Sequence, residues 1–369
     1  MKILKYISRI IIGIVFIFSG TVKAIDPLGV TYKFQDYFQA FNLDFLKNFS
    51  LLFAITLCTF EFIAGFSVLF NIRQKAGIWI IMLMMLVFTP LTFILALSNP
   101  VSDCGCFGDA IHLTNWQTFG KNIILIIPAI YLFINRNDTV SGKTSTREWS
   151  LISVLAILFV AFMFYNLRYL PVIDFLPYKT GTYIPDKMII PEGKHGDMYE
   201  STFIYEKNGV QKEFTLENYP AGDTSWKFID QKSVLVSKGY VPPIHDLAIR
   251  TMVNEDITQK ILSSKGYTIL MISKKLSEAD REELMKGFEL GNYCTENQIN
   301  YYIITASGFG EIKDFRNGLT FCQADEITLK TIIRANPGYI LLKEGTIIAK
   351  WSWANLPDNK SISEIINKQ

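Results

Sequence analysis

The chain has 369 residues, and its 36 Lys and Arg nearly balance its 34 Asp and Glu, giving a net charge of +2. This balance excludes nucleic-acid binding through a broad positive surface. Half of the residues are hydrophobic and the mean hydropathy is +0.24, which excludes a purely soluble protein of ordinary composition. Apolar residues gather before residue 171, so we expect a membrane-embedded part followed by a soluble part.

Five apolar segments are long enough, or nearly so, to span a bilayer, which takes roughly 20 residues. They are residues 7–24, 49–70, 76–97, 120–134 and 150–167. The fourth is the shortest, and its helix can start earlier, near Trp116, with Lys121 reaching the membrane interface. The sequence therefore predicts an all-α membrane bundle over residues 1–135, then a loop and a fifth span within residues 136–170.

The first segment has a second interpretation. Lys2, Lys5 and Arg9 precede an apolar run, and residues 22–24 resemble the small-residue cleavage site of a signal peptide. The four apolar segments that follow favour a retained anchor. The orientation of the rest of the chain is the same in either case.

Basic residues are distributed unequally among the loops. One set of loops, with the N-terminus, carries eight: Lys2, Lys5, Arg9, Arg73, Lys75, Arg136, Lys143 and Arg147. The alternate loops, 25–48 and 98–118, carry only Lys33 and Lys47. Because basic loops stay in the cytoplasm, we expect a cytoplasmic N-terminus and an exported C-terminal part. In a bacterium this describes an inner-membrane protein whose loop 98–118 faces the periplasm, where disulfides persist.

Two cysteines, Cys104 and Cys106, stand one residue apart in that loop. A Cys-x-Cys disulfide closes a small, strained ring, which is typical of a labile bond that exchanges, and Gly105 gives the backbone the freedom to close it. The negative charges of Asp103 and Asp109 should raise the pKa of both thiols. A purely structural disulfide and a metal site with Asp109 and His112 remain alternatives, although the spacing is tighter than in common zinc motifs.

Three features resemble a known membrane family. Residues 18–27 read Phe-Ser-Gly-Thr-Val-Lys-Ala-Ile-Asp-Pro, residues 104–108 read Cys-Gly-Cys-Phe-Gly, and Glu61 lies in the second span. Over residues 1–135 the chain is similar to the methylamine-utilisation MauE family, within the broader DoxX-like four-helix fold. The resemblance implies a role in maturing disulfide-rich exported proteins, or in electron transfer at the membrane. Nothing in the chain suggests methylamine as its substrate, and its fifth span and long tail are similar to those of uncharacterised bacterial DoxX-like proteins.

Glu61 falls near the middle of its span without a charged neighbour in the sequence. A carboxylate at that depth is costly, so by default it marks a functional site that faces the bundle interior. Lys23, at the outer end of the first span, is the expected partner. A structural ion pair and a redox or quinone site are both consistent with this pattern.

Beyond residue 170 the chain first predicts a linker and a β-hairpin within residues 171–250. Strands at 199–205 and 212–216 flank the turn dipeptide Asn208-Gly209, and a further strand is expected at 244–249. Residues 251–369 then alternate strands (267–273, 301–305, 339–342, 347–353) with helices (278–291, 325–334, 361–368). This order predicts an α/β thioredoxin-like domain, with Pro337 as a candidate cis-proline.

The position of the usual thioredoxin Cys-x-x-Cys reads Ser-Lys-Lys-Leu-Ser-Glu at residues 273–278, so that chemistry is absent. The region has two cysteines, Cys294 and Cys322, which lie near the ends of predicted elements. The remaining cysteine of the chain outside the loop, Cys58, lies within a membrane span. In an oxidising compartment Cys294 and Cys322 are expected to form a structural bridge. Alternatively they form a relay that exchanges a disulfide with Cys104 and Cys106.

We therefore expect a membrane protein that acts in thiol–disulfide exchange or in maturation of exported proteins, with Cys104 and Cys106 as the reacting pair. A non-catalytic scaffold that binds a periplasmic partner subunit is one alternative. A quinone-linked electron-transfer subunit is another. Thiol–disulfide exchange requires no bound cofactor, whereas the electron-transfer subunit would use a quinone. The expected partners are the lipid bilayer and an exported client protein.

Overall fold

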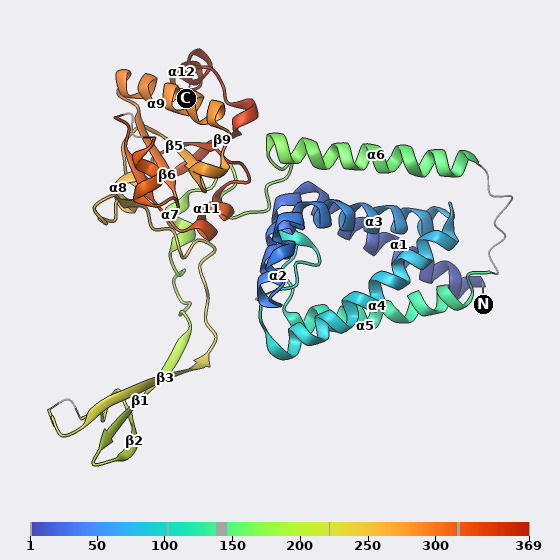
Figure 1. Ribbon diagram of the computed structural model, residues 1–369, viewed down its shortest axis with the longest axis horizontal. Helices are drawn as coiled ribbons and strands as arrows, with labels where there is room; N and C mark the ends of the chain where they lie inside the picture. Colours follow the sequence, from blue (N-terminus) through green and yellow to red (C-terminus); the bar gives the residue numbers. More distant parts are fainter. Residues whose placement is uncertain (1, 102, 138–145, 221, 316–317, 369) are drawn as a thin grey trace.

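The computed structural model describes residues 2–101, 103–137, 146–220, 222–315 and 318–368. Within them, five helices are long and apolar enough to cross a membrane (Figure 1). They are α1 (Lys2–Ile25), α3 (Ser50–Phe70), α4 (Gln74–Ser98), α5 (Asn115–Ile134) and α6 (Thr146–Tyr169). The five predicted spans are confirmed as helices. Residues 138–145, including Lys143, lie outside the described residues.

The fourth span begins where the polar capping signal lies, not where the apolar run begins. The Thr114 hydroxyl accepts a hydrogen bond from the backbone N–H of Gln117 at 3.2 Å, and the Gln117 side chain accepts one from the Thr114 N–H at 3.0 Å. This reciprocal capping box satisfies two N–H groups that would otherwise lack partners. Helix α5 is thereby extended to 20 residues.

A further helix, α2 (Pro27–Ala40), fills the loop after α1 and was not predicted. The Asp26 side chain caps it by accepting from the Gly29 N–H at 2.9 Å, and Pro27 occupies its first turn. Both residue types favour a helix start. The helix buries Val30 and Phe38 against the end of the bundle that carries the cysteine loop. It positions Tyr32, Lys33 and Tyr37 beside the two regions described below.

Helices α1 and α3 approach closely because glycines lie at their contact. A Cβ atom on Gly13 would stand 2.6 Å from the Leu69 Cβ, and one on Gly65 would stand 2.7 Å from the Ile17 backbone nitrogen. Small residues allow membrane helices to pack backbone against backbone. These helices share a hydrophobic cluster with α4 and α5 that includes Ile12, Ile81 and Leu132.

After α6 and the short helix α7 (Ile184–Met188), three antiparallel strands form a separate sheet in the order β2-β1-β3, which extends away from the rest of the molecule (Figure 1). They are β1 (Met198–Lys207), β2 (Val210–Thr215) and β3 (Lys227–Ser237). The predicted hairpin is confirmed, with Asn208 and Gly209 both at positive φ in its turn. The third strand was not predicted.

The C-terminal region forms a six-stranded sheet in the order β4-β7-β6-β5-β8-β9. Its strands are β4 (Arg250–Thr251), β5 (Tyr267–Ser273), β6 (Asn300–Thr305), β7 (Phe321–Gln323), β8 (Gly338–Lys343) and β9 (Thr346–Ser352). Strands β5, β6 and β7 are parallel, whereas β8 and β9 run antiparallel to their neighbours. The expected strand at 244–249 is wrong, because the Ile244 and Ile249 N–H groups bond to the Lys187 carbonyl and the Thr258 hydroxyl instead.

Helices cover both faces of this sheet. The helices α9 (Arg281–Glu296) and α12 (Asn359–Lys368) contribute to one hydrophobic cluster, and α8 (Thr258–Leu262) and α11 (Glu326–Ile332) contribute to the other. The short helix α10 is Phe309–Lys313. The region is thus a soluble-type α/β domain, consistent with the predicted thioredoxin-like core. The Asn336–Pro337 peptide bond is cis, which confirms the predicted cis-proline.

The α/β domain lies at the end of the bundle that carries α2 and the cysteine loop (Figure 1). The Ser352 hydroxyl donates to the Arg168 carbonyl at the end of α6 at 2.6 Å, and Lys274 donates to the Tyr32 hydroxyl of α2. Arg334 reaches Asp26 and Asp109 of the membrane-embedded part. The domain is therefore held against the bundle by polar contacts at several points.

Candidate functional site: the cysteine loop and its cavity

The loop between α4 and α5 brings the sulfur atoms of Cys104 and Cys106 to 3.3 Å from each other. Two hydroxyl groups hold this part of the loop against the bundle. Ser19 of α1 donates to the Cys106 carbonyl at 2.8 Å, and Tyr37 of α2 donates to the Cys104 carbonyl at 2.6 Å. The thiol pair is half-buried and is positioned by two different helices.

The turn depends on glycine at two positions. Gly105 has φ +63° and Gly108 has φ +53°, a region that residues with a Cβ rarely adopt. The Asp103 carboxylate accepts from the Gly105 N–H at 2.8 Å and from Lys33 at 3.1 Å. The turn therefore relies on the backbone flexibility predicted for Gly105, which adopts a positive φ there.

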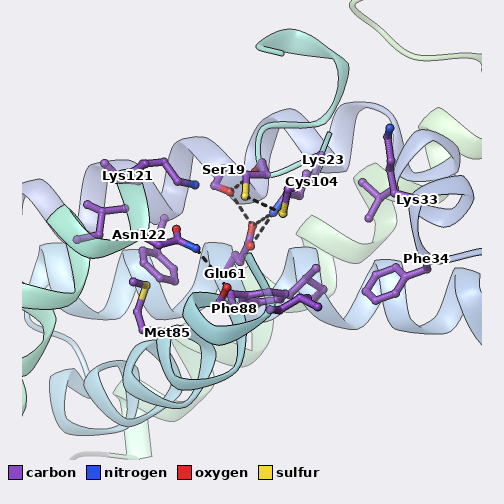
Figure 2. A pocket seen from close by; sticks show the side chains of 18 of the residues that line it. Ser19, Lys23, Lys33, Phe34, Glu61, Met85, Phe88, Cys104, Lys121 and Asn122 are labelled. Atoms are coloured by element: carbon purple, nitrogen blue, oxygen red, sulfur yellow. Dashed lines mark hydrogen bonds and ion pairs between the residues drawn. The ribbon is translucent and has the colours of Figure 1, made fainter. Parts of the chain in front are cut away.

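Directly beneath the loop, Lys23 and Glu61 form a buried ion pair (Figure 2). The Lys23 Nζ lies 2.7 Å from Glu61 Oε1 and 2.9 Å from Oε2. The Ser19 hydroxyl lies 3.0 Å from Glu61 Oε2 while it also contacts the Cys106 carbonyl, so it joins the ion pair to the cysteine loop. The structure brings together all four of the predicted residues Lys23, Glu61, Cys104 and Cys106.

Sequence reasoning missed Ser19 and Tyr37 as residues of this site. Ser19 stands four residues before Lys23 in the Phe-Ser-Gly-Thr-Val-Lys segment, a spacing that places both on one face of a helix. That spacing was a usable signal. Tyr37 could not be identified in this way because helix α2 itself was not predicted.

The two thiols differ in their electrostatics. The hydrogen bond with Cys104 lowers the pKa of the Cys106 thiol to about 6, and the positive charges of Lys121 and Lys23 assist against the opposing effect of burial. The same hydrogen bond, with burial, raises the pKa of Cys104 far above its ordinary value. The surroundings therefore favour loss of the proton from Cys106 before loss of the proton from Cys104.

The expectation that Asp103 and Asp109 raise the pKa of both thiols is wrong for Cys106. Asp109 points to Arg334, whose Nη2 lies 2.6 Å from its Oδ2, and Asp103 is engaged by Lys33. Lysines face the sulfur atoms instead, and Lys121 also lies over the Phe107 ring. The sign of the local charge was therefore decided by residues remote in the sequence.

A cavity of about 100 Å³ adjoins the thiols and the ion pair. Its polar end is formed by Cys104, Lys23 and Glu61 (Figure 2), together with Cys106. Its apolar walls come from several helices and include Val15, Phe16, Phe34, Leu57, Met85 and Phe88. An apolar cavity with a few polar groups at one end is typical of a site for a small organic molecule.

The structure does not form the expected Cys294–Cys322 bridge. Both thiols are free and fully buried, Cys294 in the cluster under α9 and Cys322 in the cluster on the opposite face of the sheet. The sheet itself separates them. The predicted bridge is therefore wrong for the described structure, and the relay with Cys104 and Cys106 stays a prediction.

The structure does not support the alternative of a metal site formed by the cysteines with Asp109 and His112. Within the described residues, no group of three His, Cys, Asp or Glu side chains is placed to hold a metal ion. Asp109 is engaged by Arg334, and the His112 side chain is 68 % exposed at the edge of the loop.

Comparison with known proteins agrees with the resemblance. Residues 1–135 match the family model of the methylamine utilisation protein MauE, and residues 199–238 match a domain of unknown function, DUF8463. Protein TlpB of Flavobacterium psychrophilum is 32 % identical over 139 residues, which cover 37 % of this chain and 38 % of that protein. No solved structure matches the chain. Residues 1–135, which hold the first four membrane-spanning helices, are a domain of the MauE family.

Proposed function

We propose that Cys104 and Cys106 exchange disulfides with cysteine pairs of exported proteins at the outer face of the bacterial inner membrane. The observation that carries the proposal is the 3.3 Å approach of two thiols with unequal proton affinity. A thiolate beside a protonated thiol is the arrangement that thiol–disulfide exchange uses. The proposed orientation follows from the basic residues of the loops.

In the reducing direction, the Cys106 thiolate attacks one sulfur of a client disulfide and displaces the other sulfur as a thiolate, which takes up a proton. Cys104 then loses its proton, attacks the Cys106 sulfur and releases the second client thiolate. Two electrons pass to the client, and the loop ends as a Cys104–Cys106 disulfide. The reverse sequence oxidises a client dithiol.

The test is capture of the intermediate in cells. In Cys104→Ser, Cys106 has no partner to release it, so we expect mixed disulfides that appear on non-reducing gels and vanish with reductant. Cys106→Ser should form at least tenfold fewer of them. Cys58→Ser, at a buried free cysteine of α3, is the matched control and should behave as wild type. Equal behaviour of all three variants would instead favour a scaffold, for which removal of residues 171–369 should lose a co-purifying partner.

A second candidate function is favoured by the cavity beside the thiols. A quinone ring in it would accept two electrons and two protons from the dithiol, leaving a quinol and a Cys104–Cys106 disulfide. Lys23 and Glu61 line the same cavity, so they lie close enough to stabilise charge on the quinone and to exchange protons with it as it is reduced.

Stopped-flow mixing of the reduced full-length protein with a short-chain ubiquinone or menaquinone tests this. Quinone absorbance should fall by one equivalent per protein. Cys104→Ser/Cys106→Ser should abolish the change, and Phe88→Trp, which narrows the cavity, should slow it. A wild-type protein that never reduces either quinone would exclude this candidate while leaving thiol exchange with clients intact.

A further inference from the structure

A second and larger cavity, of about 970 Å³, lies between the bundle and the α/β domain. Its walls come from helices α2, α3 and α6 on one side and from residues around 274–278, α11 and the Arg334–Asn336 segment on the other. It is separate in position and chemistry from the cysteine cavity. None of the thiols of the chain lines it.

The cavity is lined by more positive than negative side chains. The basic residues are Lys47, Arg168, Lys274, Lys275, Lys330 and Arg334, and the acidic ones are Glu278 and Glu326. Most of the basic residues already have carboxylate partners. Asp44 pairs with Lys47, Glu278 and Glu326 pair with Lys275, Glu326 pairs with Lys330, and Asp26 and Asp109 pair with Arg334.

Lys274 is different. It is only 7 % exposed, it lines the cavity, and within the described residues no carboxylate lies within ion-pair distance of it. Its hydrogen bond goes to the neutral hydroxyl of Tyr32. A buried ammonium group without an anionic partner is costly. Burial, followed by the charges of Arg334 and Lys330, lowers the pKa of Lys274 to about 7.

Tyr32 is the centre of this positive cluster. The charged groups of Lys274, Lys330 and Arg334 lie 5.1, 4.9 and 5.4 Å from the centre of its ring. Contact with an aromatic face offsets part of the repulsion between them. Lys330 and Arg334 already pair with carboxylates, so one more negative charge in the cavity would serve Lys274.

The remaining wall is apolar and belongs to the ends of membrane helices. Leu51 of α3 and Phe164 and Leu167 of α6 line the cavity, and Arg168 closes this side, with its guanidinium 5.2 Å from the Trp353 ring. These positions are within one or two turns of where α3 begins and α6 ends. The cavity thus pairs a cationic wall with an apolar one at the level where a span meets the membrane surface.

We propose that this cavity binds the phosphate group of an anionic phospholipid, with the headgroup at Lys274 and the acyl chains along Leu51, Phe164 and Leu167. A lipid supplies the missing negative charge and covers the apolar wall at once. It would also fasten the α/β domain to the membrane surface. The inference does not depend on the thiol chemistry proposed above.

The experiment uses delipidated full-length protein in a neutral detergent, titrated with three probes and followed by native mass spectrometry. The probes are a short-chain phosphatidylglycerol, the matching phosphatidylcholine and inorganic phosphate. Phosphatidylglycerol should bind at least tenfold more tightly than either of the others. Lys274→Met should weaken its binding at least tenfold. Lys286→Met, the same substitution on the exposed face of α9, should leave it unchanged.

Leu51→Trp tests the apolar wall and leaves Lys274 itself unchanged. Leu51 is 36 % exposed, so a larger side chain fits there without repacking the bundle. It should weaken phosphatidylglycerol binding and leave the binding of inorganic phosphate as it is. Equal binding of phosphatidylglycerol and phosphatidylcholine would overturn the proposal, as would equal binding of inorganic phosphate or an unaltered affinity in a folded Lys274→Met protein.

Discussion

Arg334 of the α/β domain forms an ion pair with Asp109 of the cysteine loop, with 2.6 Å between Nη2 and Oδ2. Its Nε lies 2.7 Å from the Asp26 Oδ2 at the start of α2. Asp109 follows Cys106 by three residues, and Arg334 precedes the cis-proline by three. One guanidinium therefore joins the thiol-bearing loop, helix α2 and the edge of the α/β domain that faces the bundle.

Replacing Arg334 by Gln should loosen the α/β domain and the cysteine loop together. The buried Asp26 and the half-buried Asp109 would then be neighbouring carboxylates without a counter-charge, which is destabilising. Amide hydrogen exchange of residues 103–115 should rise at least tenfold. Lys286→Gln, which removes an exposed charge from the far side of the domain, is the control and should change nothing there. Unchanged exchange in Arg334→Gln would show that the loop does not depend on the domain.

Alkylation of the reduced protein should distinguish the two thiols by pH. Cys106, whose pKa is lowered to about 6, should react at a constant rate above pH 7 and about tenfold more slowly for each pH unit below 6. Cys104, whose pKa is raised, should stay unmodified below pH 9. Iodoacetamide with site-resolved mass spectrometry measures both rates.

The same measurement on Cys104→Ala tests the cause. The hydrogen bond between the two thiols is the largest factor that lowers the Cys106 pKa, so its loss should move the inflection of the alkylation profile to higher pH. An inflection that stays near 6 would assign the effect to the lysines instead.

Neutralising Glu61 should destabilise the bundle. Glu61→Gln keeps the side-chain size but leaves the Lys23 ammonium, which is 5 % exposed, without a negative partner. Breaking a buried pair in this way costs about 3–5 kcal/mol. Glu148→Gln, at the more exposed pair with Arg73, should cost no more than about 1 kcal/mol. Thermal unfolding in detergent, monitored by the exposure of buried thiols, compares the stability of the two variants. Similar unfolding midpoints for both would contradict the prediction.

Two glycine substitutions in membrane helices should have opposite effects on stability. Gly65→Ala places a methyl group 2.7 Å from the Ile17 backbone nitrogen, so α1 and α3 must separate, at about 1–3 kcal/mol. Gly120→Ala meets nothing within 4 Å and gains the higher helix propensity of alanine, up to about 1 kcal/mol. The difference between their melting temperatures measures the close packing of α1 on α3 without a change in chemistry.

The sequence by itself determined the five spans, the hairpin and the alternation of the C-terminal strands and helices. Each of these is a local pattern: about 20 apolar residues for a span, an Asn-Gly pair between alternating segments for a hairpin. The pairing of Lys23 with Glu61 could also be expected, because a charge at membrane depth needs a partner. Helix α2 escaped prediction because it is short and few of its residues are buried, so its apolar pattern is weak despite the start signal of Asp26 and Pro27.

Only the tertiary structure decided the chemistry around those elements. Asp109 stands close to the thiols in sequence but faces Arg334, 225 residues away, while Lys23 and Lys121 approach Cys106 from two other helices. Cys294 and Cys322 share a domain, yet the sheet lies between them. Electrostatic influence and bond formation depend on distance and direction in space. Neither quantity is encoded in the spacing of residues along the chain.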